Sequence, residues 1–292
     1  MGGSLDRAFA IGVLLNGGFV VAEGMAGWMG NSLALIADAG HNLSDVLALL
    51  LAWGASVLAR RPPSVRRTYG LRRTTILAAL TNAILLLIAV LAISWEAIHR
   101  LRAPEQVNEL FVLGVASIGI VINTGTALLF LKGQHDINVR GAYLHMVADA
   151  AVSAGVVLAA LVQMWNGWLW IDPAASLAIA VVIAVGTWGL FRESLDFALD
   201  AVPSHIDPER VQEYLQSLPG VSEVHDLHIW GMSTTEIALT AHLVMPNGPA
   251  DDELLARMNH DLLEFFGIHH STIQVERGHT AHPCKRAEEG AV

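Results

Sequence analysis

The sequence predicts a membrane protein: a bundle of six transmembrane helices followed by a small cytoplasmic α+β domain. Of its 292 residues, 53% are hydrophobic and only 15% are charged, whereas a soluble domain carries about 25% charge. Six apolar stretches of membrane-spanning length occur before residue 200. The net charge of −10 comes from residues 199–292, which hold 15 acidic residues against 5 basic ones and nine of the 13 histidines. We therefore expect two domains: a neutral transmembrane domain over 1–200 and an acidic, histidine-rich cytoplasmic domain over 201–292.

The spans are expected at residues 8–29, 32–58, 74–97, 109–131, 140–163 and 173–197. The first lacks the basic start of a signal peptide and its apolar run is too long for one. The connector 59–73 carries six arginines, which the positive-inside rule assigns to the cytoplasm. With an even number of spans, both termini are then cytoplasmic.

Residues after Pro203 have the pattern of a small α+β fold. A helix is expected over 207–220, with Asp207 as its cap, Pro208 in its first turn and Gly220 ending it. Alternating segments on both sides of Ser233-Thr234 predict two strands. A helix over 251–266 and a strand over 271–276 complete an αββαβ order with the helices on one face of the sheet. After about residue 277 no periodicity remains, and a mobile tail is expected.

Several function classes are excluded by motifs that the chain lacks. It contains no phosphate-binding GxxxxGK[ST], no metalloprotease HExxH and no Gly-x-Ser-x-Gly elbow. The acidic tail argues against nucleic acid, whose phosphates require a basic surface. The single cysteine, Cys284, excludes a disulfide framework.

Two of the expected spans contain the pattern His-x-x-x-Asp: His41 with Asp45, and His145 with Asp149. A spacing of four places both side chains of each pair on one helix face. A charged side chain in the bilayer costs about 2.5–3.5 kcal/mol by insertion scales. Because two spans carry the same costly pattern, we expect both pairs to serve one function. Both aspartates lie 14 residues from an outer end, about 21 Å deep at a rise of ~1.5 Å per residue, so the carboxylates can meet.

Two imidazoles and two carboxylates form an N2O2 ligand set that suits tetrahedral Zn²⁺. With neutral histidines, the loaded site has no net charge, which a membrane interior tolerates. Protons on the same residues restore near-neutrality when the metal leaves, and this predicts metal–proton exchange. The alternative is a pair of structural His–Asp hydrogen bonds, one within each helix.

Other polar residues in the apolar part have more than one interpretation. Asp38 shares the face of His41 and is either an outer-vestibule ligand or a helix-packing acid. Glu23 and Asn16, like Asn123, line the same pathway, form hydrogen bonds across helices or ligate the metal directly.

The segment NSLALIADAGHNLSD, the second HxxxD, the six spans and an acidic αββαβ tail containing VHDLHIW resemble the cation diffusion facilitator family over roughly residues 8–277. The resemblance implies dimeric metal/proton antiporters that export divalent cations. It places the transport site on His41, Asp45, His145 and Asp149, and a histidine at the first position indicates a zinc preference. The short, undecorated chain resembles bacterial members, which implies the inner membrane.

The resemblance also implies a metallochaperone-like tail that binds metal at the dimer interface. The family positions fall on His225, His242, Gln274 and Glu276, and glutamine is a poor zinc ligand. We therefore expect a tail site formed by His225, His242 and Glu276. Further candidates are Asp252, His269, His270 and the pair His282 and Cys284, whereas His135, His205 and His260 are interpreted as surface residues and His228 is assigned no role.

The expected function is therefore secondary active export of divalent cations, most of all Zn²⁺, in exchange for protons by a homodimer in the lipid bilayer. One alternative is a membrane enzyme whose metal activates water, with Glu23 as general base. Another is a zinc sensor with the tail as reporter. We also expect Arg72 and Arg73 to interact with Asp200 at the start of the tail.

Overall fold

The computed structural model describes residues 17–130, 137–247 and 252–278; some side chains within the helices, including those of Asp45 and His145, lie outside that description. The chain divides into two compact units. The first comprises residues 1–51 and 81–189, and the second comprises 52–80 and 190–292. The expected mobile tail falls almost entirely on residues 279–292, outside the described part.

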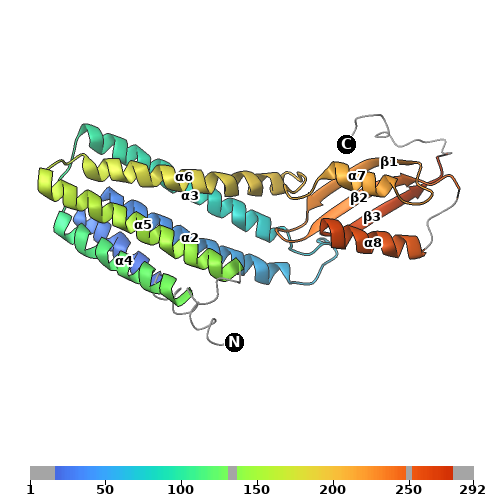
Figure 1. Cartoon of the computed structure of the whole chain (residues 1–292), viewed down its shortest axis with the longest axis horizontal. Coiled ribbons are helices and arrows are strands. Elements are labelled where there is room, and N and C mark those ends of the chain that lie inside the picture. Colours follow the sequence, from blue (N-terminus) through green and yellow to red (C-terminus); the bar gives the residue numbers. More distant parts are fainter. Residues whose placement is uncertain (1–16, 131–136, 248–251, 279–292) are drawn as a thin grey trace. The chain divides into compact units, whose positions relative to one another are not determined.

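Long helices form the apolar part of the chain (Figure 1). Residues 17–30 are helical, and the helices that follow are α2 (Leu33–Ala59), α3 (Thr74–Arg102), α4 (Glu109–Phe130), α5 (Ile137–Asn166) and α6 (Ile171–Ala198). Among the described residues, α3, α6 and stretches of α4 and α5 are long and apolar enough to cross a membrane. The prediction of a helical membrane domain is confirmed, and α3 continues five residues beyond the expected end at 97. Its extra turn contains Arg100 and Arg102, and cations at a helix C-terminus are favourable.

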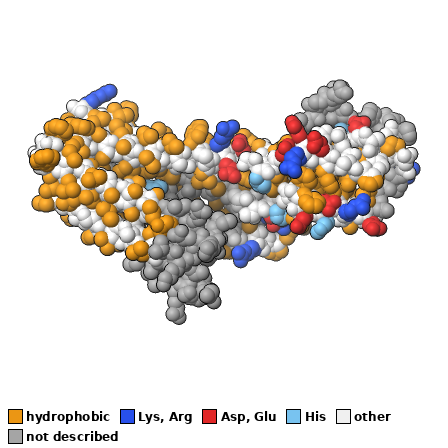
Figure 2. Space-filling view, in the orientation of Figure 1, with side chains coloured by type: hydrophobic (Ala, Val, Ile, Leu, Met, Phe, Trp, Pro, Cys, Tyr) orange, Lys and Arg blue, Asp and Glu red, His pale blue; other side chains and the backbone are white. Residues whose placement is uncertain are grey.

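Small side chains let the helices of the first unit approach closely. The buried cluster of this unit contains six alanines, together with leucine, valine and isoleucine. A Cβ on Gly119 of α4 would lie 2.8 Å from Phe19 and 3.2 Å from Ser153 Oγ of α5, so any larger residue there would force these side chains to shift. The outer surface over these helices is mostly hydrophobic, as Figure 2 shows. The packing thus brings α4 against α5 at the level of Ser153.

Asp172, in the first turn of α6, fixes the start of α2. Its carboxylate accepts a hydrogen bond from the Ser32 hydroxyl and one of 2.8 Å from the backbone N–H of Leu33. The first N–H groups of a helix have no partner within the helix, so a buried carboxylate satisfies them and complements the positive end of the helix dipole. Asp172 is 4% exposed. This contact positions the helix that carries His41.

The second unit contains the small α+β domain. Its elements are α7 (Pro208–Gln216), β1 (Glu223–Gly231), β2 (Ile237–Val244), α8 (Asp252–Phe266) and β3 (Ile268–Glu276). The strand order is β1-β2-β3, with β1 and β2 antiparallel and β2 and β3 parallel. The predicted αββαβ order is confirmed. The two helices pack on one side of the sheet (Figure 1), and one core of strand and helix residues lies between them.

The cap of α7 is as predicted, but its end is not. The Asp207 carboxylate accepts from the backbone N–H groups of Glu209 and Arg210 at 3.1 and 3.4 Å. The helix ends at Gln216 with Ser217 as C-cap, four residues before Gly220. Pro219 disfavours helix for the residue before it, and Gly220 instead takes a φ of +87° in the turn to β1.

A side-chain hydrogen bond joins the two helices of this domain. The Tyr214 hydroxyl of α7 donates to the Asp261 carboxylate of α8 at 2.8 Å. Burial, together with this neighbouring carboxylate, raises the pKa of Tyr214. Tyr214 therefore stays protonated as the donor throughout the physiological range.

A β-bulge interrupts β1 between His225 and His228. His225 pairs with His242 and His228 pairs with Thr240, so two residues of β1 oppose one residue of β2. Asp226, within the bulge, has a φ of +52°, a left-handed conformation that aspartate and asparagine tolerate better than most residues. Because of the extra residue, His225 and His228 share a face of the sheet although they are three residues apart.

The arginine-rich connector contacts the small domain within the second unit. Arg73 Nη2 lies 2.5 Å from Asp200 Oδ1, as the sequence predicts for this pair. Arg72 forms its ion pair with Glu236, in the β1–β2 turn, and not with Asp200. The Thr75 hydroxyl accepts the backbone N–H of Thr234 in the same turn at 3.1 Å. The connector and the first turn of α3 thus contact both the start of the domain and its β1–β2 turn.

Candidate metal sites

His41 of α2 and Asp149 of α5 meet in the first unit. His41 Nε2 lies 3.8 Å from Asp149 Oδ1. The aspartate side chain is only 3% exposed and the histidine side chain 24%. A carboxylate this deeply buried requires a charged or hydrogen-bonding partner, and an imidazole next to it supplies one.

A second contact between the same helices fixes their register. The Ser153 hydroxyl of α5 donates to Asp38 Oδ2 of α2 at 2.9 Å. From the Asp38 contact to the His41 contact, α2 advances three residues while α5 goes back four, so the helices run antiparallel along this seam. Asp38 and Ser153 are fully buried. Two roles were considered for Asp38, a ligand in the outer vestibule and an acid that packs helices together. The observed hydrogen bond joins α2 to α5 and fits the second role.

Glu23 extends this buried polar seam to the first helix. Its side chain is fully buried, and its carboxylate accepts a hydrogen bond of 3.2 Å from Asn42 Nδ2 of α2. Glu23 therefore bonds across helices, which is one of the roles considered for it. Asn123 of α4 is also buried, at 1% exposure, and Asn16 lies outside the described residues.

The other two expected ligands of this site are described by backbone alone. Position 45 lies in α2, four residues after His41, and position 145 lies in α5, four residues before Asp149. Both helices are continuous through these positions. The structure therefore brings His41 and Asp149 together and leaves the side chains of Asp45 and His145 outside its description.

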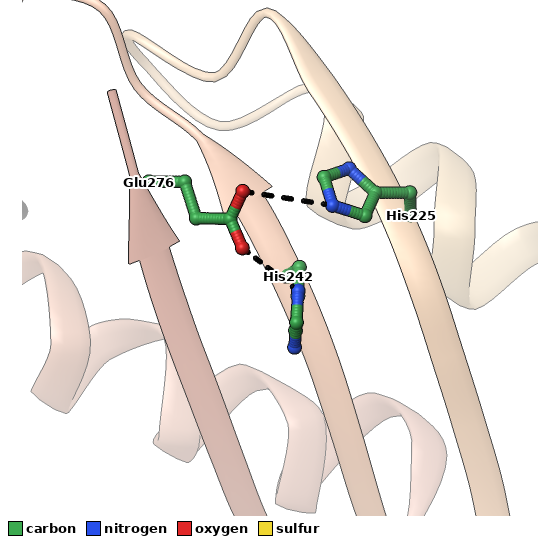
Figure 3. Close-up of side chains that lie close together, drawn as sticks. All are labelled: His225, His242 and Glu276. Atoms are coloured by element: carbon green, nitrogen blue, oxygen red, sulfur yellow. Dashed lines mark ion pairs between the residues drawn. The ribbon is translucent and has the colours of Figure 1, made fainter. Parts of the chain in front are cut away.

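The three residues expected for the tail site gather on the sheet of the small domain (Figure 3). His242 Nδ1 lies 2.9 Å from Glu276 Oε1, and His225 Nε2 lies 3.7 Å from Glu276 Oε2. The two imidazole rings are edge to face, with centroids 5.3 Å apart. One ligand atom from each of the three residues lies within 4.8 Å of the others.

The strand register explains this cluster. His225 of β1 is the direct partner of His242 of β2, which in turn pairs with Gln274 of β3. Glu276 follows Gln274 by two residues and so lies on the same face. That face is opposite to the buried core, which takes Val224 and Leu243 from the alternate positions.

The donor set fits a divalent metal such as zinc. Two imidazoles and one carboxylate are ordinary zinc ligands. Both ring nitrogens of His225 are buried and face carboxylate oxygens, Nδ1 at 3.3 Å from Glu223 Oε1 and Nε2 at 3.7 Å from Glu276 Oε2, and neither forms a regular hydrogen bond among the described residues. A metal would therefore supply a partner of good geometry to one of these nitrogens. Gln274 donates from Nε2 to Glu276 Oε1 at 2.8 Å and thus orients a ligand, which agrees with its poor suitability as one.

Two residues next to this cluster were not found by reasoning from the sequence. Asp226 Oδ2 lies 3.6 Å from His242 Nε2, and Asp226 Oδ1 lies 2.9 Å from His228 Nε2. Strict alternation places His225 and His228 on opposite faces, which is why His228 received no role. Only the bulge brings it to the metal face, and no sequence signal marks that bulge.

The remaining candidates lie apart from the cluster or outside the description. Asp252, His205, His260, His269 and His270 are exposed. His270 makes an edge contact with Tyr69, with ring centroids 5.7 Å apart. His135, His282 and Cys284 lie outside the described residues.

These features define a class: a multi-pass membrane protein with ionisable residues buried between its helices and a small α+β domain carrying a His/Glu cluster. The chain belongs to the cation efflux family, also called cation diffusion facilitators. Residues 9–197 match the family's "Cation efflux transmembrane domain", and residues 203–278 match "Cation efflux protein, cytoplasmic domain". It is therefore a transporter of metal cations and not an enzyme, so the predicted family and the transporter class are confirmed.

Several relatives match almost the whole chain. The metal cation efflux system protein CzcD of Cupriavidus metallidurans is 37% identical over 98% of this chain and 90% of its own length. The zinc transporter ZitB of Escherichia coli is 36% identical over 92% of this chain and 86% of its own. A cadmium, cobalt and zinc/H(+)-K(+) antiporter of Bacillus subtilis is 33% identical over 94% and 90%, respectively.

Proposed function

We propose that the chain exports Zn²⁺ from the cytoplasm in exchange for protons, through a site formed by His41, Asp45, His145 and Asp149. The observation that carries the proposal is the contact of His41 with the buried Asp149 between α2 and α5. The names of the relatives support the substrate and the counter-ion, since one is a zinc transporter and another a zinc/H(+)-K(+) antiporter.

The register between the helices extends this contact to four ligands. Asp38 lies level with Ser153, and His41 with Asp149. One more turn in the same direction puts backbone position 45 level with position 145. The proposed ligand set is thus one imidazole and one carboxylate from each helix, a set of donors that suits tetrahedral zinc.

The charge balance of the site explains why zinc would be exchanged for protons. Zn²⁺ with two carboxylates and two neutral imidazoles has no net charge, whereas the same residues without metal carry two negative charges in an apolar surrounding. Protons on the histidines or aspartates compensate those charges when zinc leaves. Zinc and protons therefore occupy the site alternately.

The tail site has a different role in this proposal. We propose that His225, His242 and Glu276 hold Zn²⁺ and strengthen a homodimer without lying on the translocation path. The matched cytoplasmic domain and the His/Glu cluster support this role. The division into 1–200 for transport and 201–292 for regulation follows from it.

The orientation follows from the arginines of the connector. Arg60, Arg61, Arg66 and Arg67 are exposed, and an arginine-rich connector after the second span favours the cytoplasmic side. We propose a bacterial inner-membrane protein with both termini in the cytoplasm. Cysteines introduced singly at Val65 and Trp165 test this, because only the residue-65 cysteine should be shielded from an impermeant reagent added to intact cells. Labelling of the residue-65 cysteine from outside would contradict the orientation.

Transport in proteoliposomes tests the exchange. Protein inserted with its tail outward, in vesicles loaded with a zinc dye and a pH dye, receives external Zn²⁺. We expect zinc uptake to raise the internal pH, and an acidic interior to accelerate the uptake. Zinc uptake that is independent of the pH gradient and leaves the internal pH unchanged would contradict proton exchange.

A further inference from the structure

The bulge of β1 brings a second carboxylate to the tail cluster. Asp226 Oδ2 lies 3.6 Å from Nε2 of His242, while Nδ1 of the same ring lies 2.9 Å from Glu276 Oε1. The two nitrogens of His242 thus face two different acids. The three-ligand cluster found among the described residues contains His225, His242 and Glu276 and does not include Asp226.

We propose that Asp226 is a positioning residue for the tail metal site, which rests on the metal-binding role proposed above for that site. A neutral imidazole carries one N–H, so a ring that gives Nδ1 to a metal has its proton on Nε2. Asp226 faces that proton. A carboxylate at the second nitrogen of a metal-binding histidine fixes the tautomer and the orientation of the ring and makes it a stronger ligand.

His228 completes the arrangement. Its Nε2 lies 2.9 Å from Asp226 Oδ1, a hydrogen bond in which the imidazole donates, because an ionised carboxylate only accepts. Asp226 is thereby held between two histidines, with one oxygen toward each. The side chains of Asp226 and His242 are 20% and 19% exposed, so water screens their interaction only in part.

The backbone conformation makes the proposal testable. Asp226 has a φ of +52°, which glycine and asparagine also adopt with little strain. Asp226→Gly therefore keeps the bulge and removes the acceptor. Asp226→Asn keeps both the bulge and an oxygen acceptor but removes the charge. Glu213→Gln, on an exposed position of α7, is the matched control for loss of an acid from this domain.

The experiment measures Zn²⁺ binding to the full chain in lipid nanodiscs, by competition with a fluorescent chelator. Asp149→Ala is present throughout, to remove binding at the membrane site, and His242→Ala identifies the tail-bound zinc. We expect Asp226→Gly to weaken tail binding about 10- to 100-fold, the range for such supporting carboxylates. Asp226→Asn should lie between that variant and the parent, and Glu213→Gln should match the parent.

A second readout separates positioning from a purely structural role. In protein labelled with 15N-histidine, the nitrogen shifts of His242 should indicate the Nε2–H tautomer in the parent and a mixture of tautomers in Asp226→Gly. Tail zinc bound by Asp226→Gly as tightly as by the parent, with the tautomer unchanged, would overturn the proposal. If instead His242→Ala removes no bound zinc, the tail site itself is wrong and the positioning role falls with it.

Discussion

The two candidate metal sites of this chain differ in how the backbone brings the ligands together. In the membrane unit, His41 and Asp149 come from two antiparallel helices, and the carboxylate is only 3% exposed. In the tail, His225, His242 and Glu276 come from three neighbouring strands and are 9% to 19% exposed. In the proposed function, the membrane site alternates between zinc and protons because its surroundings penalise unbalanced charge. The tail site can hold an ion without that demand.

The largest expected effect lies at the membrane site. Asp149→Ala removes one carboxylate and leaves zinc with an uncompensated positive charge in apolar surroundings. We expect zinc flux in proteoliposomes to fall to the background of empty vesicles, while insertion and dimerisation persist. Asp196→Asn, at an exposed position near the end of α6, is the control and should transport normally. Flux at the wild-type rate from well-folded Asp149→Ala protein would refute the site.

The next largest effect is expected at the tail, on the zinc-dependent association of two tails and not on zinc transport. The chain's net charge of −10 lies in 94 residues of the tail and repels a second copy unless cations neutralise it. We expect zinc to draw two tails together, and His225→Ala combined with His242→Ala to weaken that approach while zinc flux continues. Distances between spin labels on the two tails measure it. Tails that respond to zinc equally in the double variant would contradict the role.

A change of selectivity is expected from His41→Asp. A carboxylate can coordinate with two oxygens, which allows the longer bonds and higher coordination number of a larger ion. It also adds a negative charge to the loaded site. We expect the ratio of Cd²⁺ to Zn²⁺ flux to rise severalfold and zinc flux to become more dependent on pH. An unchanged ratio in a variant that still transports zinc would place the selectivity elsewhere.

The smallest effect is expected where the connector meets the tail. The side chains of Arg73 and Asp200 are 55% and 49% exposed, and exposed ion pairs contribute only about 0.2–1 kcal/mol. Arg73→Glu should therefore lower the thermal stability of the dimer slightly, and the added Asp200→Arg should restore it. A loss of dimer stability larger than an exposed ion pair contributes, or no recovery of that stability in the double variant, would mean that the connector acts by other contacts. The pair of Arg72 with Glu236 is one such contact.

The sequence predicts much of this architecture because membrane solvation leaves a simple signal. Apolar length gives the helices, and an ionisable residue within them is costly enough to draw attention to His41 and Asp149. The seam of Asp38, Ser153 and Glu23 depends on the packing of three helices, which one sequence does not encode locally. Asp172 escaped notice for the same reason: its partner is the start of α2, 138 to 140 residues away.

The tail illustrates a second limit of prediction from sequence, which concerns irregular strands. Strand alternation predicts a sheet and brings His225 next to His242, because adjacent antiparallel strands pair directly. It fails at Asp226 and His228, since one inserted residue reverses the face of everything that follows. The end of α7 is also misplaced by the sequence pattern, because Gly220 is a typical stop signal whereas Pro219 disfavours helix before it.

We propose above all that zinc and protons exchange at the membrane site and not at the tail. Recording internal zinc and internal pH together, in vesicles of one lipid composition, tests it for the wild type, Asp149→Asn and the His225→Ala/His242→Ala double variant. We expect coupled zinc and proton movement in the wild type and the double variant, and neither movement in Asp149→Asn. Continued exchange in Asp149→Asn, or its loss in the tail variant alone, would contradict it.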